Sequence, residues 1–389
     1  MINPFDEKID RRNRYSVKYD FYDKYGKSPD HLPMWVADMD FRSPPEILDA
    51  LREMADYGVF GYSHMSENYK NAIGSWFRNR FDWEVPMDGI LQIPNIMFGI
   101  ASLLNCLSKK GDSVLIQEPV YHPFREVVQE NDRNLVVNEL VYKNGRYEID
   151  FEDLEDRIRK NRVKIFLLCS PHNPVGRVWT REELEQIGAI MLRNRVFVVS
   201  DEIHADLVYP GSKHRVFASL GKELQRNCAV CSSPTKTFNI PGLHTANLFI
   251  SDPEIYRRME KEVLRYFYYG ISLPGLIAAE KAYTCCGAWK DELLIYLEEN
   301  IRFVSNSLKE LGDKIDPIRP EATYLLWLDC RKMDLSDHDL DRFFSEKAGL
   351  WLSPGTEFGQ GGSGFMRMNL ATARSNLQEA VRRIANALS

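Results

Sequence analysis

The segment Cys228–His244, CAVCSSPTKTFNIPGLH, starts like a β-strand and then presents a single lysine. The apolar run from Cys228 to Cys231 has the composition of a buried strand, and Ser-Ser-Pro-Thr ends it. Lys236 has no acidic residue within four positions on either side, so a local helical ion pair does not explain it. Two interpretations are open: a solvated loop lysine, or an amine held in an enclosed site as a nucleophile toward a carbonyl.

The composition of the 389-residue chain is that of an ordinary globular protein of about two domains. Its formal net charge of −6 argues against nucleic acid or an anionic membrane as a partner. The start, MINPFDEKIDRRNRYS, carries charges where a signal peptide needs an apolar stretch, and the longest apolar run (96–107) is too short to span a bilayer. The seven cysteines include no CxxC accompanied by a second one, which indicates reduced thiols. We therefore expect a cytoplasmic protein.

Short apolar runs alternate with amphipathic helix patterns through most of the chain. Ser43 is predicted to be the N-cap of a helix that has Pro44 in its first turn and ends at Gly58, and Thr180 with Glu183 predicts a capping box at the start of another. The strand-like runs are SVLIQ (113–117), KIFLLCS (164–170), RVFVVS (195–200) and CAVCSS (228–233). Strands too apolar to alternate, separated by helices, indicate a parallel sheet covered on both faces.

From Asp291 onward the pattern changes. A long amphipathic helix is predicted from Asp291 to Gly312, and a final helix is predicted with Ser375 and Gln378 as its cap. Between them lie three strand-like runs, ATYLLWLDC, GLWLSPG and GFMRMNLAT. The fold class is therefore α/β with two domains, and the predicted ranges are a large α/β domain (45–288), a smaller α+β domain (289–389) and an N-terminal segment (1–44) that packs against the smaller domain.

Polar and aromatic residues follow four of the predicted strands. In an open parallel sheet a ligand binds at the carboxyl ends of the strands, where this chain supplies Tyr121, Asn173, Asp201, His204 and Lys236. Pyridoxal 5'-phosphate (PLP) requires a lysine for an imine, an acid for its ring nitrogen, donors for its phenolate oxygen and a ring to stack on. Taken singly, Asp201 could cap a helix, Asn173 could belong to a turn and Tyr121 could be packing. Their joint order at successive strand ends favours a PLP site.

Several motifs resemble a known family over nearly the whole chain. The motifs SPHNPVGRVWT (170–180), VVSDEIHADL (198–207) and SPTKTFNIPGL (233–243) resemble fold-type I PLP enzymes of the class I/II aminotransferase superfamily. Within it, LPMWVADMDF (32–41), GYS (61–63) and DEIHAD (201–206) are similar to the MalY/PatB branch of C-S β-lyases, the cystathionine β-lyases.

This resemblance implies roles toward the cofactor. Lys236 would carry PLP and act as the catalytic base, Asp201 would pair with the ring nitrogen, and Asn173 would donate to the phenolate oxygen. Tyr121 would stack on the ring. His204 stands where many aminotransferases have a tyrosine on the phenolate oxygen, so it is a predicted cofactor residue whose contact stays open.

The resemblance also implies a phosphate site and a substrate site. Ser233 and backbone amides near Ile96 and Met97 would bind the phosphate, which Tyr62 from the other subunit of a homodimer would reach. Arg367 would hold the substrate carboxylate. The candidates that shape the side-chain pocket are Trp35, Tyr121 and Tyr324, although Tyr324 also fits a core position; His244, which stands where the family has a phosphate-binding arginine, is left outside the site.

The expected activity is cleavage of L-cystathionine or a related cysteine S-conjugate to pyruvate, ammonia and a thiol, with an aminotransferase as the alternative. The run GQGGSG (359–364) fits a dinucleotide fingerprint but leads into strand-like sequence, which favours a turn. Asp201, His204 and Asp206 are possible metal ligands, but no histidine pair with metal spacing accompanies them, so a metallohydrolase is less favoured. A binding module without chemistry also stays open.

Overall fold

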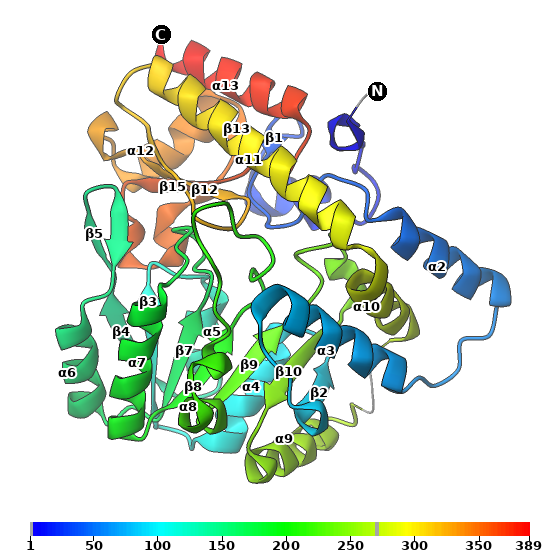
Figure 1. Cartoon of the computed structure of the whole chain (residues 1–389). Coiled ribbons are helices and arrows are strands. Elements are labelled where there is room, and N and C mark those ends of the chain that lie inside the picture. Colours follow the sequence, from blue (N-terminus) through cyan, green and yellow to red (C-terminus); the bar gives the residue numbers. More distant parts are fainter. Residues whose placement is uncertain (1–2, 269–271) are drawn as a thin grey trace.

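A seven-stranded, mainly parallel sheet forms the centre of the computed structural model, which describes residues 3–268 and 272–389 (Figure 1). Only β10 runs antiparallel to its two neighbours, β2 and β9. In sheet order the strands are β2 (Ile90–Ile93), β10 (Ala246–Ile250), β9 (Cys228–Ser232), β8 (Phe197–Asp201), β7 (Ile165–Cys169), β3 (Ser113–Glu118) and β4 (Asn134–Glu139). Each of the four predicted runs overlaps one of these strands, with β3 and β8 each extending one residue past its run, and the predicted α/β fold is confirmed.

Helices cover both faces of this sheet. On β7, Phe166 and Leu168 belong to one buried cluster, whereas Ile165 and Leu167 belong to another. Successive strand residues point to opposite faces, so two buried faces require the nearly continuous apolar runs seen in the sequence. The helices of this part are α2 (Pro45–Tyr57), α3 (Glu67–Phe81), α4 (Ile96–Leu107), α5 (Pro123–Glu130), α6 (Phe151–Asn161), α7 (Arg181–Asn194), α8 (Lys222–Arg226), α9 (Pro253–Arg265) and α10 (Leu273–Cys285).

The order of the strands reverses between β3 and β7. From β3 the chain continues to β4 on one side, and from β7 it continues through β8 and β9 on the other. Loops that leave the carboxyl ends of β3 and β7 therefore diverge and leave a crevice between them, which is where open α/β sheets bind ligands.

The C-terminal part holds a four-stranded antiparallel sheet. Its strands are β11 (Asp316–Ile318), β12 (Leu325–Asp329), β15 (Phe365–Asn369) and β14 (Ser353–Pro354), and its helices are α11 (Gly287–Glu310), α12 (Asp337–Arg342) and α13 (Arg374–Leu388). Figure 1 shows α11 leading from α10 toward this part, where it packs on α13. Two-stranded pairs are formed by β5 (Val141–Lys143) with β6 (Arg146–Glu148) and by β1 (Leu32–Pro33) with β13 (Leu350–Trp351).

The N-terminal segment, which also contains α1 (Val17–Asp20), meets the C-terminal part through the β1–β13 pair, and Phe5 belongs to the same buried cluster as Tyr296. The three-part division at residues 44 and 288 stays a prediction. Residues 1–2 and 269–271 of the predicted ranges lie outside the described residues.

Two predicted helix caps are wrong, and in each case a tertiary partner explains the difference. Helix α2 follows Pro44 without a side-chain cap, because the Ser43 hydroxyl donates to the Asn239 carbonyl (3.0 Å). Helix α13 begins at Arg374, one residue before Ser375, and the Arg374 amide donates to the Tyr296 hydroxyl (2.7 Å) instead of to a capping side chain. Hydroxyl residues near a helix start therefore do not by themselves fix the cap.

Other predicted elements hold with adjusted limits. The capping box of Thr180 and Glu183 is present at the start of α7. Helix α11 begins at Gly287, four residues before the predicted Asp291, and ends at Glu310. The glycine-rich run 359–364 forms a short turn that leads into β15, which confirms the turn interpretation. No helix among the described residues is long and apolar enough to cross a membrane.

Candidate active site

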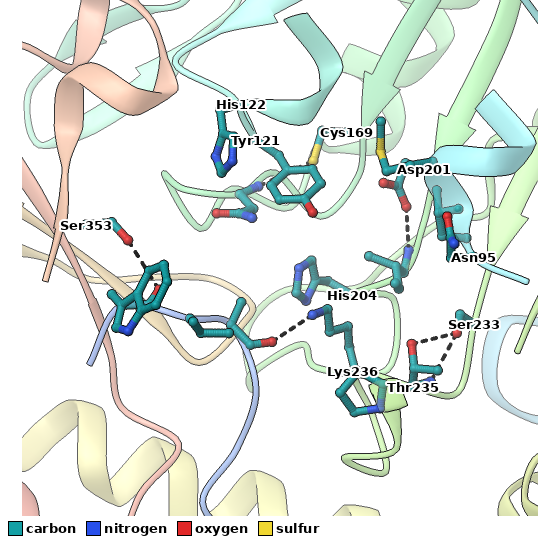
Figure 2. A pocket seen from close by; sticks show the side chains of 18 of the residues that line it. Asn95, Tyr121, His122, Cys169, Asp201, His204, Ser233, Thr235, Lys236 and Ser353 are labelled. Carbon is teal, nitrogen blue, oxygen red and sulfur yellow. Dashed lines mark hydrogen bonds between the residues drawn. The ribbon is translucent and has the colours of Figure 1, made fainter. Parts of the chain in front are cut away.

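A cavity of about 490 Å³ lies at the carboxyl ends of β3, β7, β8 and β9 (Figure 2). The predicted site residues that line it are Trp35, Ile96, Met97, Tyr121, Asn173, Asp201, His204, Ser233, Lys236 and Arg367. Tyr62 is instead fully exposed, and Tyr324 is fully buried with its hydroxyl donating to the Ala37 carbonyl (3.0 Å). The fold thus brings all but two of the predicted residues to one place.

The strand ends position most of these side chains. Tyr121 follows β3, Asn173 follows β7, Asp201 ends β8, and Ser233 and Lys236 follow β9. The opposite wall comes from the four-stranded sheet and the N-terminal segment, because Arg367 lies on β15 and Trp35 follows β1. The cavity therefore depends on contact between segments far apart in the sequence.

Lys236 projects into the cavity and donates from Nζ to the Ala37 carbonyl (2.7 Å; Figure 2). Burial lowers the pKa of this amine, and the carboxylates of Asp38 and Asp201 oppose that shift. A lowered pKa favours the neutral amine, which is the form that attacks a carbonyl. The solvated-loop interpretation of Lys236 does not fit this setting.

Asp201 is a buried carboxylic acid at the end of β8. Its Oδ1 accepts from the Ile203 amide (3.1 Å), which fixes the side chain against the following turn. Burial raises the pKa of Asp201 to about 7, and the charge of Glu202 adds to the rise, whereas the Ile203 amide and Lys236 oppose it. Without a cation beside it the ionised form of this carboxyl is costly, and a protonated ring nitrogen would supply that cation.

His204 and Tyr121 are neutral polar groups in the cavity. Burial lowers the pKa of His204 to about 3, and among the described residues its buried Nδ1 has no hydrogen-bond partner. Burial raises the pKa of Tyr121 to about 12. In Figure 2 both rings lie in the same space as Asp201 and Lys236. The imidazole therefore offers an unused hydrogen-bonding nitrogen without adding charge.

Arg367 is a buried guanidinium with N–H groups to spare. Its Nη1 donates to Asn173 Oδ1 (3.1 Å), and its Nη2 donates to the Trp35 carbonyl (2.6 Å) and Ser353 Oγ (3.2 Å). Within the described part of the chain its Nε is buried without a partner. Burial lowers the pKa of Arg367 to about 10, and Glu357 opposes the shift. An anionic acceptor would satisfy the free Nε.

The other end of the cavity is formed by two hydroxyl side chains and the start of α4. Ser233 Oγ donates to the Thr245 carbonyl (2.7 Å) and lies 2.7 Å from Thr235 Oγ1. Asn95 caps α4 by accepting from the Phe98 amide (2.9 Å), which leaves the first backbone amides of α4, at residues 96 and 97, directed at the cavity end. The N-terminus of a helix carries partial positive charge and binds phosphate readily.

Sequence reasoning missed several lining residues: Tyr25, Asn95, His122, Cys169, Thr235, Ser353 and Glu357. Asn95, directly before an apolar helix, and Thr235, in the strand-end turn, carried local signals that could have identified them. His244 also lines the cavity, although the sequence analysis leaves it out. The tight turn Pro241–Leu243 returns the chain to the site, with His244 in the left-handed conformation.

The possible metal ligands do not converge. Asp206 accepts from Trp76 Nε1 (3.0 Å) and Thr237 Oγ1 (3.0 Å), and it is not part of the cavity lining. Over residues 3–268 and 272–389 no group of three or more His, Cys, Asp or Glu side chains is placed to hold a metal ion.

Comparison with curated proteins gives relatives over the full length of the chain. Cystathionine beta-lyase PatB of Bacillus subtilis is 40% identical over 385 residues, which are 99% of this chain and 100% of that protein. Protein MalY of Escherichia coli is 31% identical over 99% of this chain and 98% of its own length.

Solved structures agree. A PLP-bound putative aminotransferase from Clostridium difficile 630 has a TM-score of 0.96 and 40% identity, covering 99% of both chains. Cystalysin from Treponema denticola, which contains PLP, has a TM-score of 0.95 and 36% identity, covering 100% of this chain and 99% of its own. The family model "Aminotransferase class I and II" matches residues 32–384. The resemblance predicted from the motifs is confirmed, and this chain belongs to the aminotransferase class I and II family.

Proposed function

We propose that this chain is a PLP-dependent C-S β-lyase that cleaves L-cystathionine, or a related cysteine S-conjugate, to pyruvate, ammonia and a thiol. The observation that carries the proposal is a cavity with a donor set for PLP beside a single guanidinium, Arg367. Among the described lining residues no second arginine is available for the far carboxylate of aspartate or 2-oxoglutarate, whereas the far end of cystathionine is a zwitterion that needs no paired guanidinium. The names of PatB and of the Mycobacterium tuberculosis relative, a putative cystathionine beta-lyase 34% identical to this chain, support the same reaction.

The residues present fit the cofactor. Lys236 would bind its aldehyde, Asp201 its ring nitrogen, and Asn173, whose Oδ1 is occupied by Arg367, would turn its amide donor to the phenolate oxygen. The first amides of α4 would hold the phosphate, and Ser233 would join them by turning its hydroxyl away from the Thr245 carbonyl. The partnerless Nδ1 of His204 gives a further hydrogen-bonding group for the cofactor. When bound, PLP withdraws electrons from the substrate Cα–H bond and so makes that proton removable.

The chain's own groups would then handle the substrate. Arg367 would take the α-carboxylate on its free Nε, and the neutral Lys236 amine would accept the Cα proton. The Cβ–S bond breaks with its electron pair leaving on sulfur, and water completes the balance of cystathionine plus water giving homocysteine, pyruvate and ammonia. Trp35, stacked on Trp351 with ring centroids 4.2 Å apart, would form a rigid apolar wall for the sulfur side chain.

Purified protein loaded with PLP should release pyruvate and homocysteine from L-cystathionine without any 2-oxo acid. The reason is that elimination needs only water, whereas transamination needs an amino-group acceptor. Lactate dehydrogenase coupling measures pyruvate, and a thiol reagent measures homocysteine. If pyruvate is absent while 2-oxoglutarate is steadily converted to glutamate, the enzyme is an aminotransferase instead.

We also propose a cytoplasmic homodimer that shares its active sites. Tyr62 is fully exposed and follows a run of other exposed apolar residues, Tyr57, Val59 and Phe60. Such a patch suits contact with a second copy of the chain. Tyr62 of one subunit would then reach the phosphate held by the other. The net charge of −6 fits the absence of nucleic acid or a membrane surface among the partners.

Mixed dimers would test the shared site. Chains carrying Tyr62→Phe and chains carrying Lys236→Ala are each expected to be impaired, but in a heterodimer one site has both a native Tyr62 and a native Lys236. Random reassortment of equal amounts should therefore restore activity to about a quarter of the wild-type value. As a control, Tyr62→Phe chains mixed with chains that carry both substitutions have no intact site and should gain nothing. A fully active monomer in sedimentation would contradict the proposal.

A further inference from the structure

Directly after Asp201, the side chain of Glu202 is buried in a polar cluster of its own. Its Oε1 accepts from Ser200 Oγ (2.8 Å) and from the Phe217 amide (2.9 Å), and its Oε2 lies 2.8 Å from His214 Nε2. The side chains of Glu202 and His214 are 0% and 2% exposed. Neither residue lines the cavity, so this titratable pair contacts no substrate.

The hydrogen bonds indicate the charges of the pair. His214 Nδ1 is buried and has no partner among the described residues, so an imidazolium there would leave a charged N–H unsatisfied. A neutral imidazole needs only its Nε2 proton, which it donates to Glu202. Ser200 Oγ and the Phe217 amide donate to the same carboxylate, so its described partners are all donors. The pair therefore carries one net negative charge.

The surroundings of the pair do not cancel this charge. The ring of His214 meets the edge of Phe81, with centroids 5.5 Å apart. The thiols of Cys228 and Cys231 are buried nearby, and the charge of Glu202 adds to burial in raising their pKa values. The flanking Lys213 and Arg215 form no ion pair with Glu202 among the described contacts.

Asp201 is the group on which this charge acts most directly. Glu202 is adjacent to it in the chain and accepts from Ser200, which precedes Asp201 on β8 and so points to the opposite face of the sheet. Glu202 therefore lies behind Asp201 as seen from the cavity. The titratable groups that face Asp201 are Lys236, Tyr121, Cys169, Cys231 and Glu202. A fixed negative charge nearby makes a carboxylate more basic. In addition, the Ala205 amide donates to the Glu202 carbonyl (2.9 Å), which ties the pair to the turn that carries His204.

We propose that Glu202 and His214 are a positioning pair that fixes the turn after β8 and holds a negative charge behind Asp201, so that Asp201 keeps the cofactor's ring nitrogen protonated to higher pH. The inference rests on the proposed function for the pairing of Asp201 with PLP. Glu202 would thus raise the pKa of the cofactor's ring nitrogen through Asp201, without touching the cofactor.

Glu202→Gln in the PLP-loaded enzyme tests the role of the charge. The amide has the same shape, keeps an acceptor for Ser200 and Phe217, and can donate to His214 once the imidazole proton moves to the partnerless Nδ1, so the fold should be retained at a lower Tm. We expect the midpoint of the alkaline transition in the visible spectrum of the bound cofactor to fall by roughly 0.5–1 pH unit. The Kd for PLP, measured by dialysis, should rise about 3–10-fold.

Matched variants separate charge from packing. Ser200→Ala removes one hydrogen bond to Glu202 and lowers the Tm but keeps the carboxylate, so the spectral midpoint should not move. His214→Gln keeps both a donor and the carboxylate, and the midpoint should again stay in place. An unchanged midpoint in Glu202→Gln, or an equal shift in Ser200→Ala, would overturn the proposal.

If Glu202→Gln does not fold, the double variant Glu202→Met, His214→Phe replaces the pair by apolar side chains of similar volume, a change that buried pairs often tolerate. It must show the same lowered midpoint, and a wild-type midpoint in it would also overturn the proposal. If the wild-type protein binds no PLP, the proposed function fails. If the wild type binds PLP and its spectrum titrates, but neither variant shifts the midpoint, only the role proposed for Glu202 and His214 fails.

Discussion

Lys236→Ala is expected to lower kcat for any cysteine S-conjugate by about 10⁴-fold or more and to abolish the visible absorption of a lysine-bound cofactor. The variant loses both the amine that binds the aldehyde and the base that accepts the Cα proton. Its fold should persist, because Lys236 makes one hydrogen bond, to the Ala37 carbonyl. Steady-state assays, an absorption spectrum and a thermal melt measure the three effects.

Two further variants make this result specific. Lys236→Arg keeps a cation in the cavity but cannot form an imine, so it should be as inactive as the alanine variant. Lys290 is a buried lysine outside the cavity lining, and Lys290→Met should keep the visible absorption and turnover. Borohydride followed by peptide mapping should place the reduced cofactor on Lys236. Full activity in Lys236→Ala would defeat the proposed chemistry.

The strand ends explain why much of the candidate site could be predicted. Tyr121, Asn173, Asp201 and Lys236 each stand just past a short apolar run, and such runs are recognised from local sequence. Parallel strands then place these residues at one edge of a sheet whatever the remaining structure. The sequence order of the motifs was therefore sufficient to group residues from four different loops.

The outer wall of the cavity could not be predicted in this way. Tyr25 and Trp35 reach it because β1 pairs with β13, and Ser353 and Glu357 reach it because β14 pairs with β15. Pairing between distant short strands leaves no periodic signal in either segment. A distant contact also explains why the predicted cap at Ser375 is wrong. The Arg374 amide at the start of α13 donates to the hydroxyl of Tyr296 from α11, which local sequence does not reveal.

Asp201→Asn is expected to change stability in opposite directions with and without cofactor. In the cofactor-free protein burial raises the pKa of Asp201 to about 7, above the value of about 3.9 for an exposed aspartate. The folded state therefore binds more protons than the unfolded state between these two values, and the stability of the wild-type protein falls as pH rises from about 4 to about 7. Asparagine cannot ionise, so it removes this cost and keeps the Oδ1 that accepts from the Ile203 amide.

At pH 8 cofactor-free Asp201→Asn should thus be more stable to urea than the cofactor-free wild type, by about 1–3 kcal/mol, and the difference should shrink toward pH 4. With PLP bound the order should reverse, because only the carboxylate can pair with a protonated ring nitrogen, and kcat should fall by about 10²–10³-fold. Urea unfolding of both forms at pH 4.5 and 8, with cystathionine turnover, measures these stabilities and the loss of kcat.

Equal cofactor-free stabilities at pH 8 would show that the buried carboxylate costs nothing to ionise. Unchanged stability and turnover of the loaded variant would show that Asp201 does not pair with the cofactor. The expected crossing of the two stability orders follows from one physical fact: a carboxylate that is costly to bury alone becomes favourable once a cation lies against it.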